Sequence, residues 1–527
     1  MRSLFSRRSG QSGGHHRLRI TAAVAVTVGG LLLSACSSGG SDGDGSAAST
    51  NQVLKFGFSA EPAKPTTNAG TASTVNYQLY GLMHRGVMMY SDTGKVVPAL
   101  AEKADQVDDT TYTFTLRSGL KFSDGSALTA QNVKNSLLHY ADPANSARSY
   151  PGMKYIKSIE VTDDQNFTIT LSSPNSSFLE FLADPSAFIV PDSELKEGAE
   201  ADIGAGPFKL TSWKDGVGLT LKKSNDYYDA KDVKLKEIDV TFYPDATARV
   251  NALQSGDVDF IDYVPWESFD QLKSAGLTVK GAVSSFQVAQ FNVTKAPFNN
   301  PLVREAVAYA INRDNANKAA FFGNATSLYG IPDTGSTGEK LWSHDPDKAK
   351  ELLKQAGYTN GGPTVHLLAN STYTFLQDVA TSLQADLEAV GFKVELTSPD
   401  WNTFTEQALK GQYDVTVQGE IANVTDPSAW LAVMVQPPTA ANKTYGYNND
   451  ALNKALGSAL SSTDKTAKQK YLDEAYQIIG TDVPFASIDR RTQAYAYDSK
   501  VAGFSVMKGF TQPYSINNLT NVYMADN

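Results

Sequence analysis

The chain has 527 residues, with 46 basic and 56 acidic side chains and a formal net charge of −10. Charges of both signs are mixed along it, which argues against a nucleic-acid-binding protein, because those proteins cluster positive charge. The length exceeds what one hydrophobic core supports and predicts two or three domains. A single cysteine excludes an intramolecular disulfide, so burial of apolar side chains must stabilise the fold.

The first 35 residues predict an export signal. Five arginines precede an apolar run over residues 20–35, which is too short for a permanent membrane span but suits a signal peptide. The run ends in LSAC, which is similar to the lipobox of bacterial lipoproteins and implies cleavage before Cys36 and lipid on its thiol. General secretion of a lipoprotein is therefore expected. An ordinary secretory signal with an incidental cysteine is the alternative. Loss of residues 1–35 moves the net charge to about −15.

A flexible tether is predicted over residues 36–51. Its Ser, Gly, Asp and Ala residues cannot bury enough apolar surface to fold. The tether contains a Gly-x-Ser-x-Gly pattern at 39–43, which is also found at the nucleophile of some hydrolases. That pattern needs a strand before it and a helix after it, and this segment predicts neither, so we assign it no catalytic role.

The rest of the chain alternates strand-like and helix-like segments, which predicts an α/β fold. Strands are expected where apolar residues alternate with polar ones or form a short run, at 53–58, 112–116 and 167–171. Helices are expected to begin at Asn300 and Asp345, each followed by proline, and near Phe375. The second should end at Gly357 and the third at Gly391. Their apolar stripes are expected to face the core.

Few residues suggest chemistry. Four widely spaced histidines remain after the signal peptide, and they do not form a metal-ligand pattern: His84, His139, His344 and His366. The pairs Asp108-Asp109 and Asp163-Asp164 lie in turn-like contexts and predict exposed loops rather than acid–base dyads. No phosphate-binding or dinucleotide-binding glycine pattern is present. We therefore expect no cofactor, no metal and no catalytic residue.

Five segments, in order along the chain, are similar to the family-5 solute-binding proteins, the extracytoplasmic receptors of peptide, nickel and oligosaccharide ABC importers. The first reads GKVVPALAEKADQVDDTTYTFTLRSGLKFSDGSALTAQNVKNS, and the third contains GDVDF. The resemblance covers about residues 52–525. The five segments are 94–136, 204–210, 246–262, 291–314 and 345–358.

This resemblance implies an α/β fold of two lobes, the type II periplasmic-binding-protein fold, with an extra domain inserted in the first lobe. The chain would cross between the lobes near residues 286–292 and 485–491, and closure about this hinge would bury a ligand. The implied parts are a signal peptide (1–35), a tether (36–51), lobe one (52–90, 205–283 and 486–527), the inserted domain (91–204) and lobe two (284–485).

The ligand class depends on a segment of lobe two that begins at Gly419. In oligopeptide-binding members an aspartate of this segment pairs with the peptide's α-amino group, and here Asn423 stands in its place while Asp426 keeps the register. An amide cannot provide the charge-assisted bond that a buried ammonium needs. Glu420, at a family tryptophan position, is either a relocated amine partner or an exposed strand-end carboxylate. Blocked peptides and sugars therefore stay open.

The resemblance also implies further ligand contacts, each of which could equally be structural. Trp401 matches a tryptophan at the cleft edge, with a partly buried core residue as the alternative. An aromatic face can stack on a peptide bond or a sugar. Trp266 and Trp430 are expected to pack in the core. The other candidates are a loop, a residue of the inserted domain and a polar pair: Asn68, Ala69, Gly70, Tyr150, Asp262 and Tyr263.

The expected function is that of a substrate-binding lipoprotein on the outer face of the cytoplasmic membrane. It would be a monomer that captures an oligopeptide or similar small solute and delivers it to the permease and ATPase subunits of an ABC importer. An oligosaccharide receptor of the same fold and a ligand sensor that signals to a membrane partner are the alternatives, followed by a secreted hydrolase.

Overall fold

The computed structural model describes residues 50–68, 74–196, 198–332, 341–420, 425–437 and 443–526. Cys36, Ala69, Gly70 and Asn423 lie outside these ranges, as do the signal peptide and most of the tether. The chain divides into residues 1–45 and one compact unit from residue 46 onward, and only the second is described below. In the described ranges, no helix combines the length and apolar character that a membrane crossing requires.

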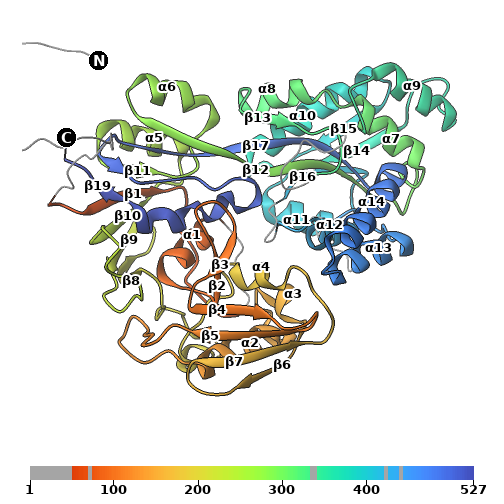
Figure 1. Ribbon diagram of the computed structural model, residues 1–527. Coiled ribbons are helices and arrows are strands. Elements are labelled where there is room, and N and C mark those ends of the chain that lie inside the picture. The colour runs from red at the N-terminus through yellow and green to blue at the C-terminus, as the bar shows by residue number, and fades with distance from the viewer. Residues whose placement is uncertain are drawn as a thin grey trace, which may run out of the picture. The chain divides into compact units, whose positions relative to one another are not determined.

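A large mixed sheet, with eleven strands in the described ranges, forms the centre of this unit, in the order β15-β14-β16-β12-β17-β11-β1-β10-β9-β8, with β13 beside β17. Two long antiparallel strands, β12 and β17, connect its two halves (Figure 1). The strands are β1 (Val53–Phe58), β8 (Phe208–Lys214), β9 (Gly218–Lys223), β10 (Glu237–Phe242), β11 (Phe260–Ile261), β12 (Thr278–Phe291), β13 (Ala325–Ser327), β14 (Thr364–Leu368), β15 (Lys393–Thr397), β16 (Val415–Glu420) and β17 (Phe485–Tyr497).

We call the part around β1 and β8–β11 lobe one, and the part around β14–β16 lobe two. The residue boundaries between them stay a prediction. Each lobe has its own hydrophobic core. Lobe one holds α1 (Thr74–Met83), α5 (Ala246–Ser255) and α6 (Phe269–Ser274). Lobe two holds α7 (Pro301–Ala310), α8 (Arg313–Phe321), α9 (Pro346–Gln355), α10 (Thr374–Ala389), α11 (Trp401–Leu409), α12 (Pro427–Val435), α13 (Asp450–Ser461) and α14 (Lys465–Asp482).

The predicted helices of lobe two are confirmed with their start and stop signals. The side chain of Asn300 accepts a hydrogen bond from the Leu302 amide at 3.0 Å and caps α7. The side chain of Asp345 caps α9 in the same way. Gly357 and Gly391 follow α9 and α10 with φ of +99° and +108°, which glycine adopts without strain. The local signals were therefore sufficient for these elements.

A second, antiparallel sheet has the order β4-β5-β7-β6 and a separate core. We call it, with the helices that pack on it, the inserted domain. Tyr112, Phe114 and Leu116 are buried in alternation with polar neighbours, which confirms the predicted strand there. The elements are β4 (Ala101–Gln106), β5 (Thr111–Leu116), α2 (Ala130–Ala141), α3 (Tyr150–Met153), β6 (Ile156–Val161), β7 (Asn166–Leu171) and α4 (Phe178–Ala183).

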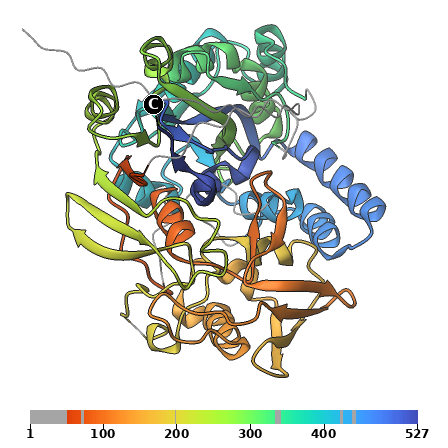
Figure 2. The same ribbon diagram turned by 60° about the vertical axis from the view of Figure 1, so that its left-hand side comes forward.

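Short elements complete the fold. Asp108 and Asp163 are exposed at turns of the inserted domain and accept hydrogen bonds from backbone amides there, as their turn-like contexts predicted. The short elements are β2 (Met88–Tyr90), β3 (Val96–Pro98), β18 (Val501–Ala502), β19 (Tyr523–Met524), and the 3-10 segments η1 (Pro143–Asn145), η2 (Asp192–Glu194), η3 (Trp266–Ser268) and η4 (Gly509–Asn521). Figure 2 shows the inserted domain below the large sheet, with α13 and α14 to its right.

Candidate functional site

Buried polar side chains line the strands that join the two lobes. Burying such groups costs free energy unless they find partners, so their concentration in a sheet interior marks a site rather than a core. In β17, Asp489 and Arg491 lie two positions apart and project from the same face of the sheet, whereas Arg490 between them projects from the other face. We call this set the polar floor: Ser285, Gln287, Gln290, Thr416, Gln418, Ser487, Asp489, Arg490, Arg491 and Gln493, all less than 9% exposed.

Three side chains form the centre of the polar floor. The side-chain amide of Gln287 is oriented so that both its nitrogen and its oxygen form hydrogen bonds. The nitrogen donates to Asp489 Oδ1, and the oxygen accepts from Arg491 Nη1 at 3.0 Å. The other oxygen, Asp489 Oδ2, has no hydrogen-bond partner in the described part of the chain. Burial raises the pKa of Asp489 to about 8, against the opposing effect of Arg491 and Arg313. Asp489 is therefore mostly protonated at neutral pH, and arginine charge dominates the floor.

Replacing Asp489 by asparagine should flatten the pH dependence of stability. The folded protein keeps a proton on Asp489 up to about pH 8, whereas the unfolded chain releases it near pH 4, so Asp489 lowers stability as pH rises between these values. The amide of the D489N variant cannot titrate. We expect the wild type to lose about 2–4 kcal/mol more than D489N between pH 5 and pH 8.

Urea denaturation of both proteins at several pH values measures this difference. Glu194, whose pKa burial raises to about 7, is common to both proteins, so its contribution cancels. Parallel stability curves for the two proteins would show that Asp489 is ionised in the fold.

Aromatic side chains of lobe two lie beside the polar floor. Tyr373 and Trp401 are 46% and 41% exposed, and their rings meet edge to face with centroids 5.5 Å apart. The guanidinium of Arg491 lies 4.7 Å from the centroid of Phe375. Exposed aromatic rings next to a buried cation are typical of a binding surface, because they combine stacking faces with charge. The ring of Trp401 also stacks on that of buried Phe404, with centroids 5.5 Å apart, so its ligand contact stays a prediction.

Trp266 and Trp430 pack inside the protein, as expected. Trp430 is 4% exposed and its ring lies 5.4 Å from that of Phe286. Trp266 packs against Phe321 at 4.9 Å, and its Nε1 donates to the Thr492 carbonyl at 2.7 Å.

Gly419 is the predicted ligand residue that adjoins the polar floor. A Cβ atom there would lie 3.6 Å from Arg491 Nη1 and 3.4 Å from the Gln287 amide. The backbone of the next residue, Glu420, pairs with Phe286 of β12. Asn423 lies outside the described residues, so the argument about the peptide amine stays a prediction.

The lobe-one candidates differ in their surroundings: Asn68 lies at a cavity, whereas the carboxylate of Asp262 is hydrogen-bonded within lobe one. Asn68 lines a small cavity and contacts His139 at 2.7 Å. Tyr150, half-buried, begins α3, two residues after another residue of that cavity. Asp262 is fully buried and accepts from the Ser59 amide, the Ser59 hydroxyl and Gln78.

These bonds give Asp262 a structural role in lobe one. Tyr263, which follows it, is half-buried and has a φ of +44°. A ligand contact for either residue remains a prediction.

A polar contact joins the inserted domain to lobe two. Ser177 donates to Asp426 Oδ2 at 2.5 Å, and Glu180 Oε2 accepts from the Thr425 amide at 2.5 Å. The Asp426 carboxylate is also paired with Lys468. Burial raises the pKa of Asp426, but Lys468 and the serine hydroxyls lower it more, so it lies below its ordinary value. We call this set the inter-lobe contact: Ser176, Ser177, Glu180, Thr425, Asp426, Leu460 and Lys468.

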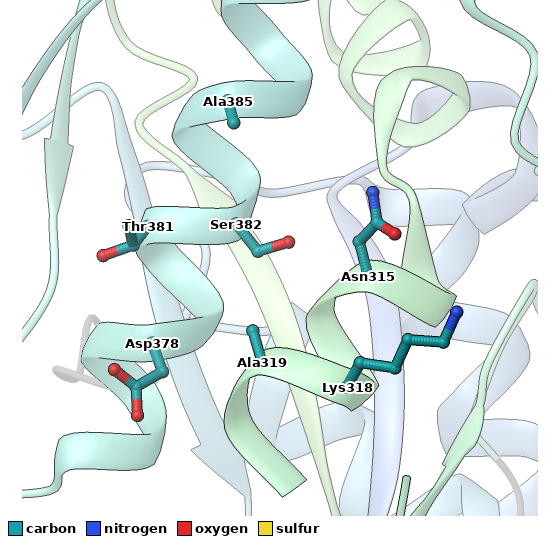
Figure 3. Close-up of a pocket in the computed structure, with 7 residues that line it drawn as sticks. All are labelled: Asn315, Lys318, Ala319, Asp378, Thr381, Ser382 and Ala385. Carbon is teal, nitrogen blue, oxygen red and sulfur yellow. The ribbon is translucent and has the colours of Figure 1, made fainter. Parts of the chain in front are cut away.

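A separate groove of about 560 Å3 lies between α8 and α10, away from the polar floor. Ala319 and Ala385 line it together with Ser382, while Lys318 of α8 and Asp378 of α10 lie on its opposite sides (Figure 3). It contains none of the predicted site residues. Its walls are short side chains of two helices, and we assign it no ligand.

Sequence reasoning missed most of the residues that form the site. Gln287, Asp489 and Arg491 were not proposed, nor was Arg148, whose surroundings are described below. One signal was available: the polar run DRRTQ interrupts the otherwise largely apolar segment FASIDRRTQAYAY, which forms β17.

Known proteins of similar sequence and structure agree with this architecture. Residues 95–442 match the family described as bacterial extracellular solute-binding proteins, family 5 Middle. The chain is 32% identical over 481 residues to the glutathione-binding protein GsiB of Pectobacterium atrosepticum, covering 87% of this chain and 92% of that protein. GsiB of Escherichia coli strain K12 is 33% identical over 444 residues, covering 80% and 86%.

Two solved structures share the fold over almost their whole length. The periplasmic binding protein AgaA of A. tumefaciens R10, in complex with agropinic acid, superposes with a TM-score of 0.80 at 34% identity, covering 90% of this chain and 99% of AgaA. DppA of Helicobacter pylori is an ABC transporter-associated periplasmic binding protein in complex with the peptide STSA. It superposes with a TM-score of 0.77 at 26% sequence identity, covering 90% of this chain and 98% of DppA. The predicted type II fold is thereby confirmed, and the chain belongs to family 5 of the bacterial extracellular solute-binding proteins.

Proposed function

We propose that the protein is the substrate-binding lipoprotein of an ABC importer. It captures a small peptide or a similar charged solute between its lobes by hinge closure and passes it to the membrane permease. The observation that carries this proposal is the polar floor, which lies on the two strands that connect the lobes and on β16 of lobe two beside them. A site there touches both lobes, so its ligand can favour the closed arrangement over an open one.

The charge of the polar floor supports a charged ligand over a neutral sugar. Arg491 is buried there, and Asp489 does not compensate it at neutral pH because the pKa of Asp489 is raised to about 8. An arginine buried without a full counter-charge favours an anionic group, since a neutral ligand would leave the charge unpaired. Relatives named for glutathione, agropinic acid and the peptide STSA agree with this choice.

Native mass spectrometry of protein purified without ligand stripping tests the proposal, followed by calorimetry with glutathione, the peptide Ser-Thr-Ser-Ala and maltotriose. We expect a bound peptide-sized mass and binding of at least one of the two peptides. Hexose-spaced masses or binding of maltotriose alone would favour an oligosaccharide receptor. Failure to bind any small solute would contradict the proposal.

The anchor is a separate part of the proposal, supported by the LSAC sequence. Replacing Cys36 by alanine should remove the lipid site, so the protein should move from the membrane fraction to the soluble exported fraction. Immunoblotting of fractionated cells measures this, and ligand affinity of the purified protein should be unchanged. Membrane retention of C36A at the wild-type level would show that something other than lipid on Cys36 attaches the protein to the membrane.

A further inference from the structure

A small cavity lies between lobe one and the inserted domain, away from the groove described above. Its volume of about 10 Å3 admits one water-sized group, so it can hold the end of a ligand but not a whole one. Its walls come from three places: the segment before α1, helix α1 itself, and two loops of the inserted domain. The lining residues are Thr66, Thr67, Asn68, Tyr77, Tyr80, Arg148, Ser186 and Phe188.

Arg148 is the cation of this cavity. Its Nε donates to the Tyr77 hydroxyl at 3.0 Å, and of the residues that the structure describes only Tyr77 accepts a hydrogen bond from it. The residue is exposed to solvent although protein surrounds most of the guanidinium. The outer nitrogens of the guanidinium are therefore oriented by the Tyr77 bond and still available. Such a fork matches the two oxygens of a carboxylate.

Tyr77 adds a second donor. Burial and the nearby Asp184 raise the pKa of Tyr77 to about 12, so its hydroxyl keeps its proton at neutral pH. Because the oxygen of this hydroxyl already accepts from Arg148, its own proton remains available to a ligand. Arg148 and Tyr77 thus present donors to the same small cavity.

Asp184, whose charge acts on both Tyr77 and Arg148, makes its hydrogen bonds to other residues. Asp184 is 4% exposed, and its Oδ1 accepts from the Ser186 amide at 2.8 Å and the Ser186 hydroxyl at 2.6 Å. Its Oδ2 accepts from Tyr514 at 3.4 Å. No ion pair between Asp184 and Arg148 exists within 4.0 Å among the described residues. The Asp184 carboxylate thus bonds mainly to Ser186, two residues later in the same loop. Burial raises the pKa of Asp184.

Segment η4 contacts both Tyr77 of the cavity and strand β12. The ring of Tyr514 lies 5.6 Å from that of Tyr77, and two residues earlier Gln512 accepts from Ser284 of β12 at 3.2 Å. Segment η4 therefore lies against both a wall of the cavity and β12.

We infer that Arg148 and Tyr77 form a carboxylate subsite, and that the protein selects solutes with a free carboxylate at one end. This inference rests on the proposed function and names the substrate class. A planar carboxylate places one oxygen in the small cavity between the Arg148 fork and the Tyr77 hydroxyl.

Calorimetry with two matched ligand pairs tests the subsite. The probes are glutathione against its glycyl ethyl ester, and Ala-Ala-Ala against its C-terminal amide; each pair differs by one negative charge. For at least one pair we expect the wild type to bind the acid at least 30-fold more tightly than the neutral analogue. R148Q should reduce acid affinity by a similar factor and leave the neutral analogue within threefold. Y77F should reduce the affinity for the acid about three- to tenfold.

The outcomes separate the subsite from the proposed function. If the wild type binds both members of each pair equally, the subsite is overturned while solute binding stands. If R148Q weakens acid and analogue alike, Arg148 has only a structural role and the inference fails. If the wild type binds none of these probes, the inference fails together with the ligand class of the proposed function. The ratio of the wild-type affinities for the acid and its neutral analogue is measured without any variant, so a folding defect cannot obscure it.

Discussion

Replacing Ser177 by alanine is expected to weaken ligand binding by about ten- to a hundredfold without lowering the stability of the ligand-free protein. Ser177 is fully buried and donates to Asp426 Oδ2 at 2.5 Å, from the inserted domain to lobe two. A hydrogen bond to a charged group contributes about 1.5–3 kcal/mol. This bond requires the two parts to touch, so its loss penalises the closed arrangement alone, and the apparent affinity falls with the population of that arrangement.

Ser428 provides the matched control for this prediction. Its hydroxyl donates to the other oxygen of the same carboxylate at 2.6 Å, but both residues belong to lobe two, so their bond persists when the lobes separate. S428A should lower the melting temperature and leave ligand affinity within threefold of the wild type. S177A should lower ligand affinity and leave the melting temperature of the ligand-free protein unchanged. Calorimetry and thermal unfolding measure the two effects. Equal affinity of S177A and wild type would show that the inter-lobe contact does not contribute to closure.

Replacing Gly206 by alanine should destabilise the fold by about 3–5 kcal/mol. A Cβ atom at this position would lie 2.4 Å from the Met83 carbonyl carbon and 2.6 Å from the His84 backbone nitrogen. Both are main-chain atoms at the end of α1, so they cannot move aside as a flexible side chain would. The Gly206 amide also donates to the Met83 carbonyl at 2.9 Å, which holds the returning chain against the helix.

A melting temperature lower by about 5–15 °C is the expected readout, since 1 kcal/mol corresponds to a few degrees in domains of this size. Gly457 is the control, because it lies within α13 and no atom approaches its Cβ position within 4 Å. G457A should melt at the wild-type temperature or slightly above it, because alanine favours a helix by about 1 kcal/mol over glycine. If G206A melts with the wild type, the close approach at α1 is looser than the structure indicates.

The elements that could be predicted from the sequence are those whose signals are local. The side-chain cap at Asn300, the proline after it and the glycine after α9 act within a few residues, so they need no knowledge of the rest of the fold. The alternation of Tyr112, Phe114 and Leu116 shows which face of a strand is buried for the same reason. The family could also be identified, because five segments keep their order along the chain.

The candidate site was only partly predictable, because a resemblance transfers a residue's position but not its partners. Gly419 does adjoin the polar floor. Asp262, in contrast, has its carboxylate occupied by Ser59 and Gln78. Arg148 was not predicted, because its hydrogen bond to Tyr77, 71 positions earlier, leaves no local pattern in the sequence.

By itself, the sequence determined the local elements, the family and the likeness of Cys36 to a lipoprotein anchor, since each depends on neighbouring residues or on ordered motifs. Only the tertiary structure decided which polar residues meet. The pairing of β12 with β17 creates the polar floor, and the bond from Ser177 to Asp426 joins residues 249 positions apart. Such contacts depend on how distant strands and domains pack, because a side chain's surroundings are set by whatever segment the fold places against it.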